Sequence, residues 1–155
     1  MSGKSTSIPG PPSRPLPDLG CACATLRRAG RLVTRLYSEE MGDVIEPAQF
    51  ALLSALERVP GASQTGLGAA LGLDKSTLSR NLRLLQRKGW LEPAIGGEDQ
   101  RQRGFRLTES GSRVLAETTP AWRRAQARLR ASLPAGDWEG MFELIDRVSA
   151  AALAQ

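Results

Sequence analysis

The chain of 155 residues contains no histidine, and this absence removes several classes of function. Without histidine there can be no Ser-His-Asp or Cys-His catalysis, no imidazole proton shuttle and no zinc site with a histidine ligand. The carboxylates and lysines that remain form no recognisable catalytic group in the sequence. We therefore expect a protein that is not an enzyme and that requires no cofactor.

Aromatic residues and long apolar runs are scarce. Phe, Trp and Tyr together make up 5% of the residues, which favours helices packed through Leu and Ala over a β-sandwich. No apolar run approaches the ~20 residues of a membrane span. Several of the prolines lie near the N-terminus, where a signal peptide would have its apolar segment. We expect a cytoplasmic protein without a membrane partner, whose two cysteines are reduced.

The positive charge is concentrated in one part of the chain. The net charge is +5, which favours a polyanionic partner without distinguishing DNA, RNA and a membrane surface. Cations outnumber anions between Ser63 and Leu107, and this segment holds most of the excess. Any polyanion should therefore contact this segment first.

Hydrophobic spacing and capping residues predict six helices and one β-hairpin. The expected helices occupy residues 21–41, 47–59, 64–71, 75–88, 109–129 and 137–154, and the expected strands occupy residues 90–95 and 104–107. Ser63, Asp74 and Thr108 are the expected N-caps. Pro120 falls inside the fifth helix, where we expect it to kink the helix or to leave a carbonyl group unpaired.

The third and fourth helices have the pattern of a helix-turn-helix motif. Small residues in Ala69–Asp74 suit the tight turn, and Gly72 can adopt a positive φ. In the fourth helix Leu78, Leu82 and Leu85 form the apolar face. Its other side chains are of the types that contact phosphates and base edges in a major groove: Lys75, Ser76, Thr77, Ser79, Arg80 and Arg83. The alternative is a solvated surface helix with apolar backing.

The segment between the two strands has the composition of a DNA-binding wing. Residues 96–103 combine a Gly-Gly tip with Arg101 and Arg103, which can enter the minor groove next to the fourth helix. We expect Asp99 to pair with one of these arginines and to fix the shape of the wing. The alternative is a freely solvated pair.

These motifs resemble those of the MarR family of bacterial winged helix-turn-helix regulators. The similarity runs from Cys21 to the C-terminus and is most specific in Gly68–Leu82, Leu85–Leu91, Asp99-Gln100-Arg101 and Arg106–Gly111. It implies a mainly α fold with a small β-hairpin, in which a winged helix-turn-helix domain is joined to a helical dimerisation region. It also implies a homodimeric repressor that binds a pseudo-palindromic operator in double-stranded DNA and is released by a small effector.

Dimerisation is also indicated by the residues themselves. The last two helices have apolar faces that so small a winged domain would leave partly exposed, and a symmetric dimer would bury them. A monomer that uses both helices in its own core is the alternative. The expected parts are a disordered Pro/Ser/Gly-rich tail (1–18), a dimerisation helix (19–45), a DNA-binding domain (46–108) and the C-terminal dimerisation helices (109–155).

The resemblance implies an effector site between the dimerisation helices and the winged domain. Many effectors of the family are aromatic acids or phenols, and the candidates to border such a site here are Tyr37, Met41, Phe50 and Trp122. Plain core packing is the alternative for each of these four residues.

Cys21 and Cys23 are the only cysteines, and their spacing suggests another kind of effector. Two neighbouring thiolates suit soft ions such as As(III), Sb(III) or Cu(I). The alternatives are that both cysteines are structural or that they respond to oxidation. For the whole chain, the alternative to an operator-binding regulator is a winged-helix module that binds protein or RNA. The sequence does not specify the effector, the operator, the regulated genes or the choice between repression and activation.

Overall fold

The structure is a computed structural model that describes residues 20–94 and 104–154. Within these residues it contains six helices and one two-stranded sheet. The elements are α1 (Ala22–Met41), α2 (Pro47–Arg58), α3 (Gln64–Leu71), α4 (Lys75–Arg87), β1 (Leu91–Pro93), β2 (Phe105–Leu107), α5 (Glu109–Ala131) and α6 (Asp137–Leu153). The prediction of a mainly helical fold with a small antiparallel pair of strands is confirmed.

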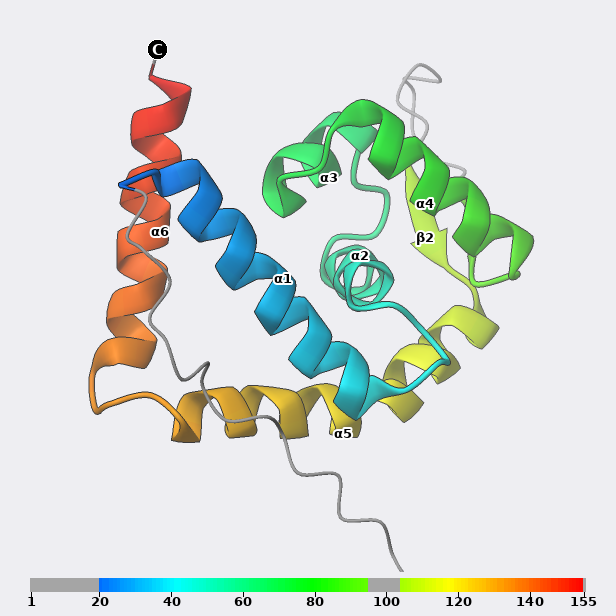
Figure 1. The fold of residues 1–155 in the computed structure, drawn as a ribbon. Helices are drawn as coiled ribbons and strands as arrows, with labels where there is room; N and C mark the ends of the chain where they lie inside the picture. The colour runs from blue at the N-terminus through cyan, green and yellow to red at the C-terminus, as the bar shows by residue number, and fades with distance from the viewer. Residues whose placement is uncertain (1–19, 95–103, 155) are drawn as a thin grey trace, which may run out of the picture.

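Helix α2 lies at the centre of the fold (Figure 1). Helices α3 and α4 and the strands lie on one side of it, while α1 and α5 pack against it from the other. The largest fully buried side chains come from α2 and α4: Leu52, Leu53, Leu56, Leu82 and Leu85. One hydrophobic core therefore passes through α2 and joins the two sides of the fold.

The two strands form a short antiparallel ladder behind α4. Leu91 lies opposite Leu107, and Pro93 lies opposite Phe105. Leu91 and Phe105 are buried in the core. The N–H of Gly61, which follows α2, donates to the carbonyl oxygen of Phe105 at 2.9 Å. The ladder is thereby tied to the end of the central helix.

Three helices begin at the N-caps that the sequence predicts. The Ser63 hydroxyl accepts a hydrogen bond from the N–H of Gly66 at 3.1 Å. A carboxylate oxygen of Asp74 accepts from the N–H of Thr77 at 2.9 Å. Each contact satisfies a backbone donor that the first turn of the helix would otherwise leave free.

Helix α5 is joined tightly to the strands at its N-terminus. The Thr108 hydroxyl accepts from the N–H of Gly111 at 3.0 Å and donates to the carbonyl oxygen of Gly89 at 2.6 Å. Gly111 is buried against Trp90, and a Cβ at this position would overlap the carbonyl oxygen of Trp90. The first turn of α5 thus moves as one unit with β1 and β2.

Helix α5 continues without a break from Glu109 to Ala131, two residues beyond the expected end at Leu129. Pro120 lies inside it and, lacking an N–H, offers no donor to the carbonyl oxygen of Ala116. The kink and the unpaired carbonyl group expected at this proline stay predictions. The helix tolerates the loss because Pro120 is on the exposed side.

Ion pairs connect the C-terminal half of α5 to the end of α1. Glu40 accepts from Arg128 at 3.2 Å and lies 3.6 Å from Arg124. Glu39 lies 3.9 Å from the same Arg128. Next to these groups Ala125 is completely buried, so the two helices are in close contact. Helix α1 is therefore held by the far end of α5, away from the strands.

Helix α6 has no buried residue. Its apolar face carries Phe142, Leu144, Ile145 and Val148, whose exposed fractions are 39–53%. Leu26 and Leu32 on α1 are also exposed. An apolar surface of this size on a small protein is typical of an interaction site.

Candidate nucleic-acid interface

Helix α4 separates apolar and polar side chains onto opposite faces. Leu78, Leu82 and Leu85 are buried in the core with exposed fractions of 2% or less. The predicted DNA-contacting residues lie on the rest of the helix: Lys75, Ser76, Arg80 and Arg83 are exposed, while Thr77 and Ser79 are half-buried. The structure therefore brings these six residues together on one element.

Three of these six side chains, those of Thr77, Ser79 and Arg83, make hydrogen bonds inside the protein. The Thr77 hydroxyl donates to the second carboxylate oxygen of Asp74 at 2.6 Å, so it belongs to the helix cap. Arg83 donates to the hydroxyl and the carbonyl oxygen of Ser79, at 3.1 and 3.3 Å. Its guanidinium group is thereby directed along the helix surface.

The other three predicted DNA-contacting side chains on α4 are not engaged with the described part of the chain. Within residues 20–94 and 104–154, the side chains of Lys75, Ser76 and Arg80 make no hydrogen bond or ion pair. All three lie in the first two turns of α4, where the partial positive charge of the helix N-terminus also attracts an anion. These turns can meet a phosphate backbone and the edges of bases without breaking an internal contact.

The tight turn before α4 has the expected geometry. Gly72 ends α3 with φ 61° and ψ 30°, a left-handed conformation that favours glycine. The N–H of Leu73 then donates to the carbonyl oxygen of Gly68 at 3.0 Å. Asp74 follows directly and caps α4, so three consecutive residues set the angle between the two helices.

Two further basic residues lie near the C-terminal end of α4 and on the strands. Lys88 lies 4.4 Å from the centroid of the Trp90 ring, directly after α4. On the ladder, Arg106 donates to Glu92 at 2.8 Å, so its charge is matched within the sheet. The expected wing residues Asp99, Arg101 and Arg103 lie outside the described residues, and their roles stay predictions.

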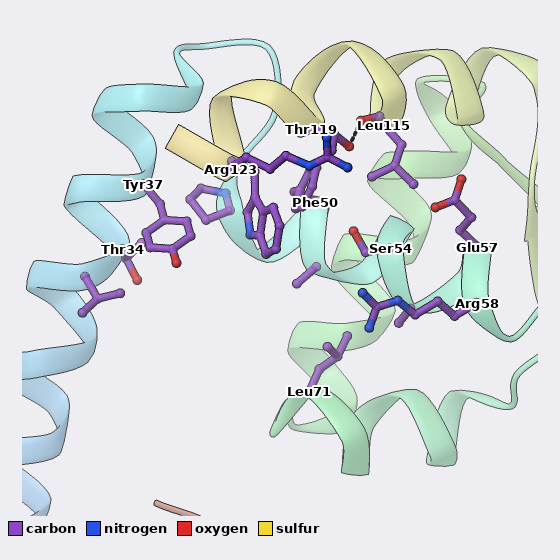
Figure 2. Close-up of a pocket in the computed structure, with 15 residues that line it drawn as sticks. Thr34, Tyr37, Phe50, Ser54, Glu57, Arg58, Leu71, Leu115, Thr119 and Arg123 are labelled. Atoms are coloured by element: carbon purple, nitrogen blue, oxygen red, sulfur yellow. Dashed lines mark hydrogen bonds between the residues drawn. The ribbon is translucent and has the colours of Figure 1, made fainter. Parts of the chain in front are cut away.

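A cavity of about 590 Å³ lies between α1, α2 and α5 and reaches Leu71 at the end of α3 (Figure 2). Three of the four predicted effector residues line it: Tyr37, Phe50 and Trp122. The rings of Phe50 and Trp122 are stacked, with centroids 5.6 Å apart and an interplanar angle of 24°. Met41 does not line the cavity, because its side chain is buried in the core where α1 ends.

Charged side chains that the sequence analysis missed also line this cavity. Arg58 and Glu57 come from α2, and Arg123 comes from α5. Neither arginine has an ion-pair partner among the residues that the structure describes. Phe50, Ser54 and Arg58 follow one another on α2 at intervals of four residues and all line the cavity, and this spacing could have indicated Arg58.

The Tyr37 phenol lines the cavity from α1. Partial burial raises the pKa of Tyr37 above its ordinary value, because removal from water disfavours the phenolate. The group is therefore a neutral hydroxyl at physiological pH and can donate a hydrogen bond into the cavity.

Cys21 and Cys23 lie at the opposite end of α1 from this cavity. Both thiols are free and exposed; Cys21 is the N-cap of α1, and Cys23 lies in its first turn. Along the helix axis Cys21 is roughly 24 Å from Tyr37, at ~1.5 Å per residue. In the described part of the chain, no group of three or more Cys, Asp or Glu residues is placed to hold a metal ion. The thiols and the cavity are thus two separate places for an effector.

None of the helices in the described ranges combines the length and apolarity needed to cross a membrane. The longest, α5, carries charged residues in its first and last turns.

Comparison with known proteins agrees with this geometry. A sequence model of the MarR family matches residues 45–102. The HTH-type transcriptional regulator PetP of Rhodobacter capsulatus is 39% identical over 80 residues, which cover 51% of this chain and 48% of PetP. The aligned stretch thus spans about half of that relative.

Solved structures extend the similarity over most of the chain. The M. tuberculosis transcriptional regulator MosR in complex with DNA has a TM-score of 0.76 at 32% identity, covering 86% of this chain and 97% of MosR. The PcaV regulator of Streptomyces coelicolor, in complex with its natural ligand, has a TM-score of 0.77 at 31% identity and covers 90% and 99% of the two chains. With these matches and the polar face of α4, the chain belongs to the MarR family of winged helix-turn-helix, DNA-binding transcriptional regulators.

Proposed function

We propose that this regulator is a homodimeric repressor that binds a pseudo-palindromic operator and leaves it when a small aromatic acid fills the cavity. The observation that carries the proposal is the face of α4 on which Lys75, Ser76 and Arg80 are exposed and uncommitted. An exposed arginine and short hydroxyls at the start of such a helix suit major-groove contacts. The solved complex of the similar MosR with DNA supports this use of the fold.

Two copies of the chain would read the two halves of the operator. The exposed apolar face of α6 and the exposed Leu26 and Leu32 of α1 supply the surface that a second copy would bury. The charges of these helices are complementary. Besides Arg35 and Glu139, which pair with Glu39 and Arg130 within the chain, basic residues on α1 (Arg27, Arg28 and Arg31) and acidic residues on α6 (Asp137, Glu143 and Asp146) carry charges of opposite sign. Packing of α1 on α6 of the partner would satisfy both properties.

The cavity suits a planar monoanion. The stacked pair of Phe50 and Trp122 offers an aromatic wall, and the lining charges of Arg58, Arg123 and Glu57 leave one excess positive charge. The neutral phenol of Tyr37 adds a hydrogen-bond donor for a carboxylate. An aromatic carboxylate matches this combination of ring and charge. The ligand complex of the similar PcaV supports an effector role.

The test is a nuclease footprint on the duplex upstream of the protein's own gene, followed by fluorescence anisotropy on the protected sequence. We expect a protected pseudo-palindrome, affinity that falls steeply with salt, and release by benzoate or 4-hydroxybenzoate. Protection of a sequence without two-fold symmetry would contradict the dimeric operator. Equal affinity for an unrelated RNA would contradict specific DNA binding.

The cysteines support a second candidate effector, a soft metalloid ion. Both thiols are exposed two residues apart, and a buried structural role within one protomer does not account for them. Thiol-reactive As(III) or Sb(III) would suit two adjacent sulfurs. Antimonite should then release the wild type from its operator but not the Cys21→Ser/Cys23→Ser variant. If antimonite released both proteins from the operator equally, or released neither, the cysteines would not be the sensor.

A further inference from the structure

The cavity between α1, α2 and α5 is large for an aromatic acid with one ring. Its volume is about 590 Å³. A water molecule takes about 30 Å³ in the liquid, and at that share for each heavy atom an acid of about ten heavy atoms fills at most about half of the cavity. Roughly twenty heavy atoms, or two aromatic rings with their substituents, would fill it. The volume is also ordinary for a pocket that holds a ligand of this size.

Two arginines mark opposite ends of the cavity. Arg123 follows Trp122, whose ring is stacked on that of Phe50 at 5.6 Å, so it enters the cavity close to Phe50. Arg58 is the last residue of α2 and lies about 12 Å beyond Phe50 along the helix axis, at ~1.5 Å per residue. In the view of Figure 2, Phe50 and Ser54 lie between the two arginines. A ligand that contacts both guanidinium groups must therefore lie along α2.

The space between the two arginines is mostly apolar. The side chains that line it are those of Phe50, Ala51, Ala55, Leu71, Leu115 and Trp122. Ala51 and Ala55 follow one another at an interval of four residues on the face of α2 that borders the cavity, and each contributes only a methyl group. Aromatic rings could lie against this face and be removed from water.

The two ends of the cavity differ in the groups that they offer. Arg58 is next to Glu57, and the hydroxyl of Ser54 lies one turn before it on α2. None of these three side chains makes a hydrogen bond or an ion pair within the described ranges. A phenol hydroxyl both donates and accepts, so it suits a carboxylate beside a guanidinium group. Arg123 has no carboxylate beside it among the lining residues of α5, which favours the carboxylate of a ligand.

We propose that the effector is a hydroxyaryl acid with two rings that lies along α2, with its carboxylate at Arg123 and its hydroxyl at Arg58 and Glu57. The inference rests on the proposed function, because it names the class of acid that fills the same cavity. It makes Arg58 the residue that recognises the far end of the effector. An acid with one ring would bind through Arg123 and leave the Arg58 end to water.

Isothermal titration calorimetry tests the size of the effector. The probe is 4′-hydroxybiphenyl-4-carboxylate, compared with 4-hydroxybenzoate. We expect one molecule of the probe per chain and an affinity at least roughly tenfold higher than that of the one-ring acid, because the second ring buries further apolar surface. Equal or tighter binding of the one-ring acid, in one copy or two, would overturn the inference and leave the proposed effector class standing. Binding of neither acid would contradict both.

The place of the hydroxyl is tested by removing it from the ligand and from its partner in the protein. Biphenyl-4-carboxylate lacks the hydroxyl, and Arg58→Met keeps the length of the side chain without the charge. The hydroxyl should raise the affinity of wild type roughly fivefold and that of Arg58→Met not at all. Arg113→Met is the control, because Arg113 pairs with Glu109 outside the cavity. An equal gain from the hydroxyl in wild type and Arg58→Met would contradict its contact with Arg58.

The length of the cavity is tested by shortening it. Ala55→Leu places a larger side chain before the Arg58 end, so it should weaken the two-ring acid roughly tenfold more than the one-ring acid. Ala48→Leu is the matched control, because Ala48 is exposed on the same helix and does not line the cavity. Circular dichroism checks that both variants fold, and the comparison with Arg58→Met does not depend on them. Equal loss of the two acids in Ala55→Leu would overturn the inference.

Discussion

Asp74 and Thr77 close the start of α4 with two hydrogen bonds, one to each carboxylate oxygen. The N–H of Thr77 donates at 2.9 Å and its hydroxyl donates at 2.6 Å. These bonds fix the first turn of the helix that carries Lys75, Ser76 and Arg80. The positions of these three side chains therefore depend on the exposed carboxylate of Asp74.

Asp74→Ala should lower both the melting temperature and the affinity for the operator, because α4 loses its cap. Asp43→Ala removes the same charge from an exposed loop between α1 and α2 and is the matched control. Thermal unfolding followed by circular dichroism, and anisotropy on the operator, check both effects. Equal behaviour of the two variants would show that the cap does not position α4.

The same cap should make stability depend on pH in the acid range. The hydroxyl and then the N–H of Thr77 hold the pKa of Asp74 below its ordinary value. The stabilisation is thus fully present above the unfolded pKa near 3.9 and is lost as the pH falls through the lower folded pKa. Wild type should lose melting temperature below about pH 4 more steeply than Asp74→Asn. Parallel curves for the two proteins would contradict this.

Gly111→Ala should destabilise the fold by at least ~2 kcal/mol, because its Cβ would overlap the carbonyl oxygen of Trp90. Gly140→Ala is the matched control within α6, where a Cβ meets no atom within 4 Å. That change should stabilise the helix by ~0.5–1 kcal/mol. Chemical denaturation measures both values. A neutral Gly111→Ala would contradict the close packing of α5 on the strands.

The contact between α1 and α5 can be tested by a double-mutant cycle. Glu40→Gln and Arg128→Gln each remove one charge from a partly exposed pair 3.2 Å apart. We expect a coupling of ~0.5–1 kcal/mol, because the pair is screened by solvent and Glu40 also faces Arg124. Denaturation of the two single variants and the double variant gives the coupling. A value of zero would mean that Ala125 and its apolar neighbours hold the helices together without these charges.

Arg123→Met should weaken binding of 4-hydroxybenzoate roughly tenfold, or ~1.4 kcal/mol, because a charged hydrogen bond to the carboxylate is lost. Quenching of the fluorescence of Trp122 reports the binding. Arg113→Met is the control, since Arg113 lies on the same helix and pairs with Glu109 outside the cavity. Equal loss in both variants would contradict a direct contact of Arg123 with the acid.

Local signals in the sequence were sufficient for most of the fold. The caps at Ser63, Asp74 and Thr108 depend only on a side chain and a backbone N–H three residues later, so they could be predicted without knowing the tertiary structure. The turn at Gly72 is local in the same way. The apolar face of α4 follows from helical spacing alone.

The cavity could be predicted only in part, because residues far apart in the sequence assemble it. The family resemblance suggested Tyr37, Met41, Phe50 and Trp122 as residues that border an effector site, and all of these except Met41 line the cavity. Arg123 was missed because nothing in the neighbouring sequence distinguishes it from the other arginines of α5. Its place beside the cavity depends on how α5 packs against α2.

The central claim is that the start of α4 reads the operator, and Arg80 tests it most directly. Fluorescence anisotropy on the footprinted duplex should compare wild type, Arg80→Ala and Arg113→Ala at several salt concentrations. We expect Arg80→Ala to lose ~1–3 kcal/mol of binding to the operator, and less on an unrelated duplex, while Arg113→Ala behaves as wild type. Unchanged operator affinity in Arg80→Ala, or the same loss on both duplexes, would contradict the claim.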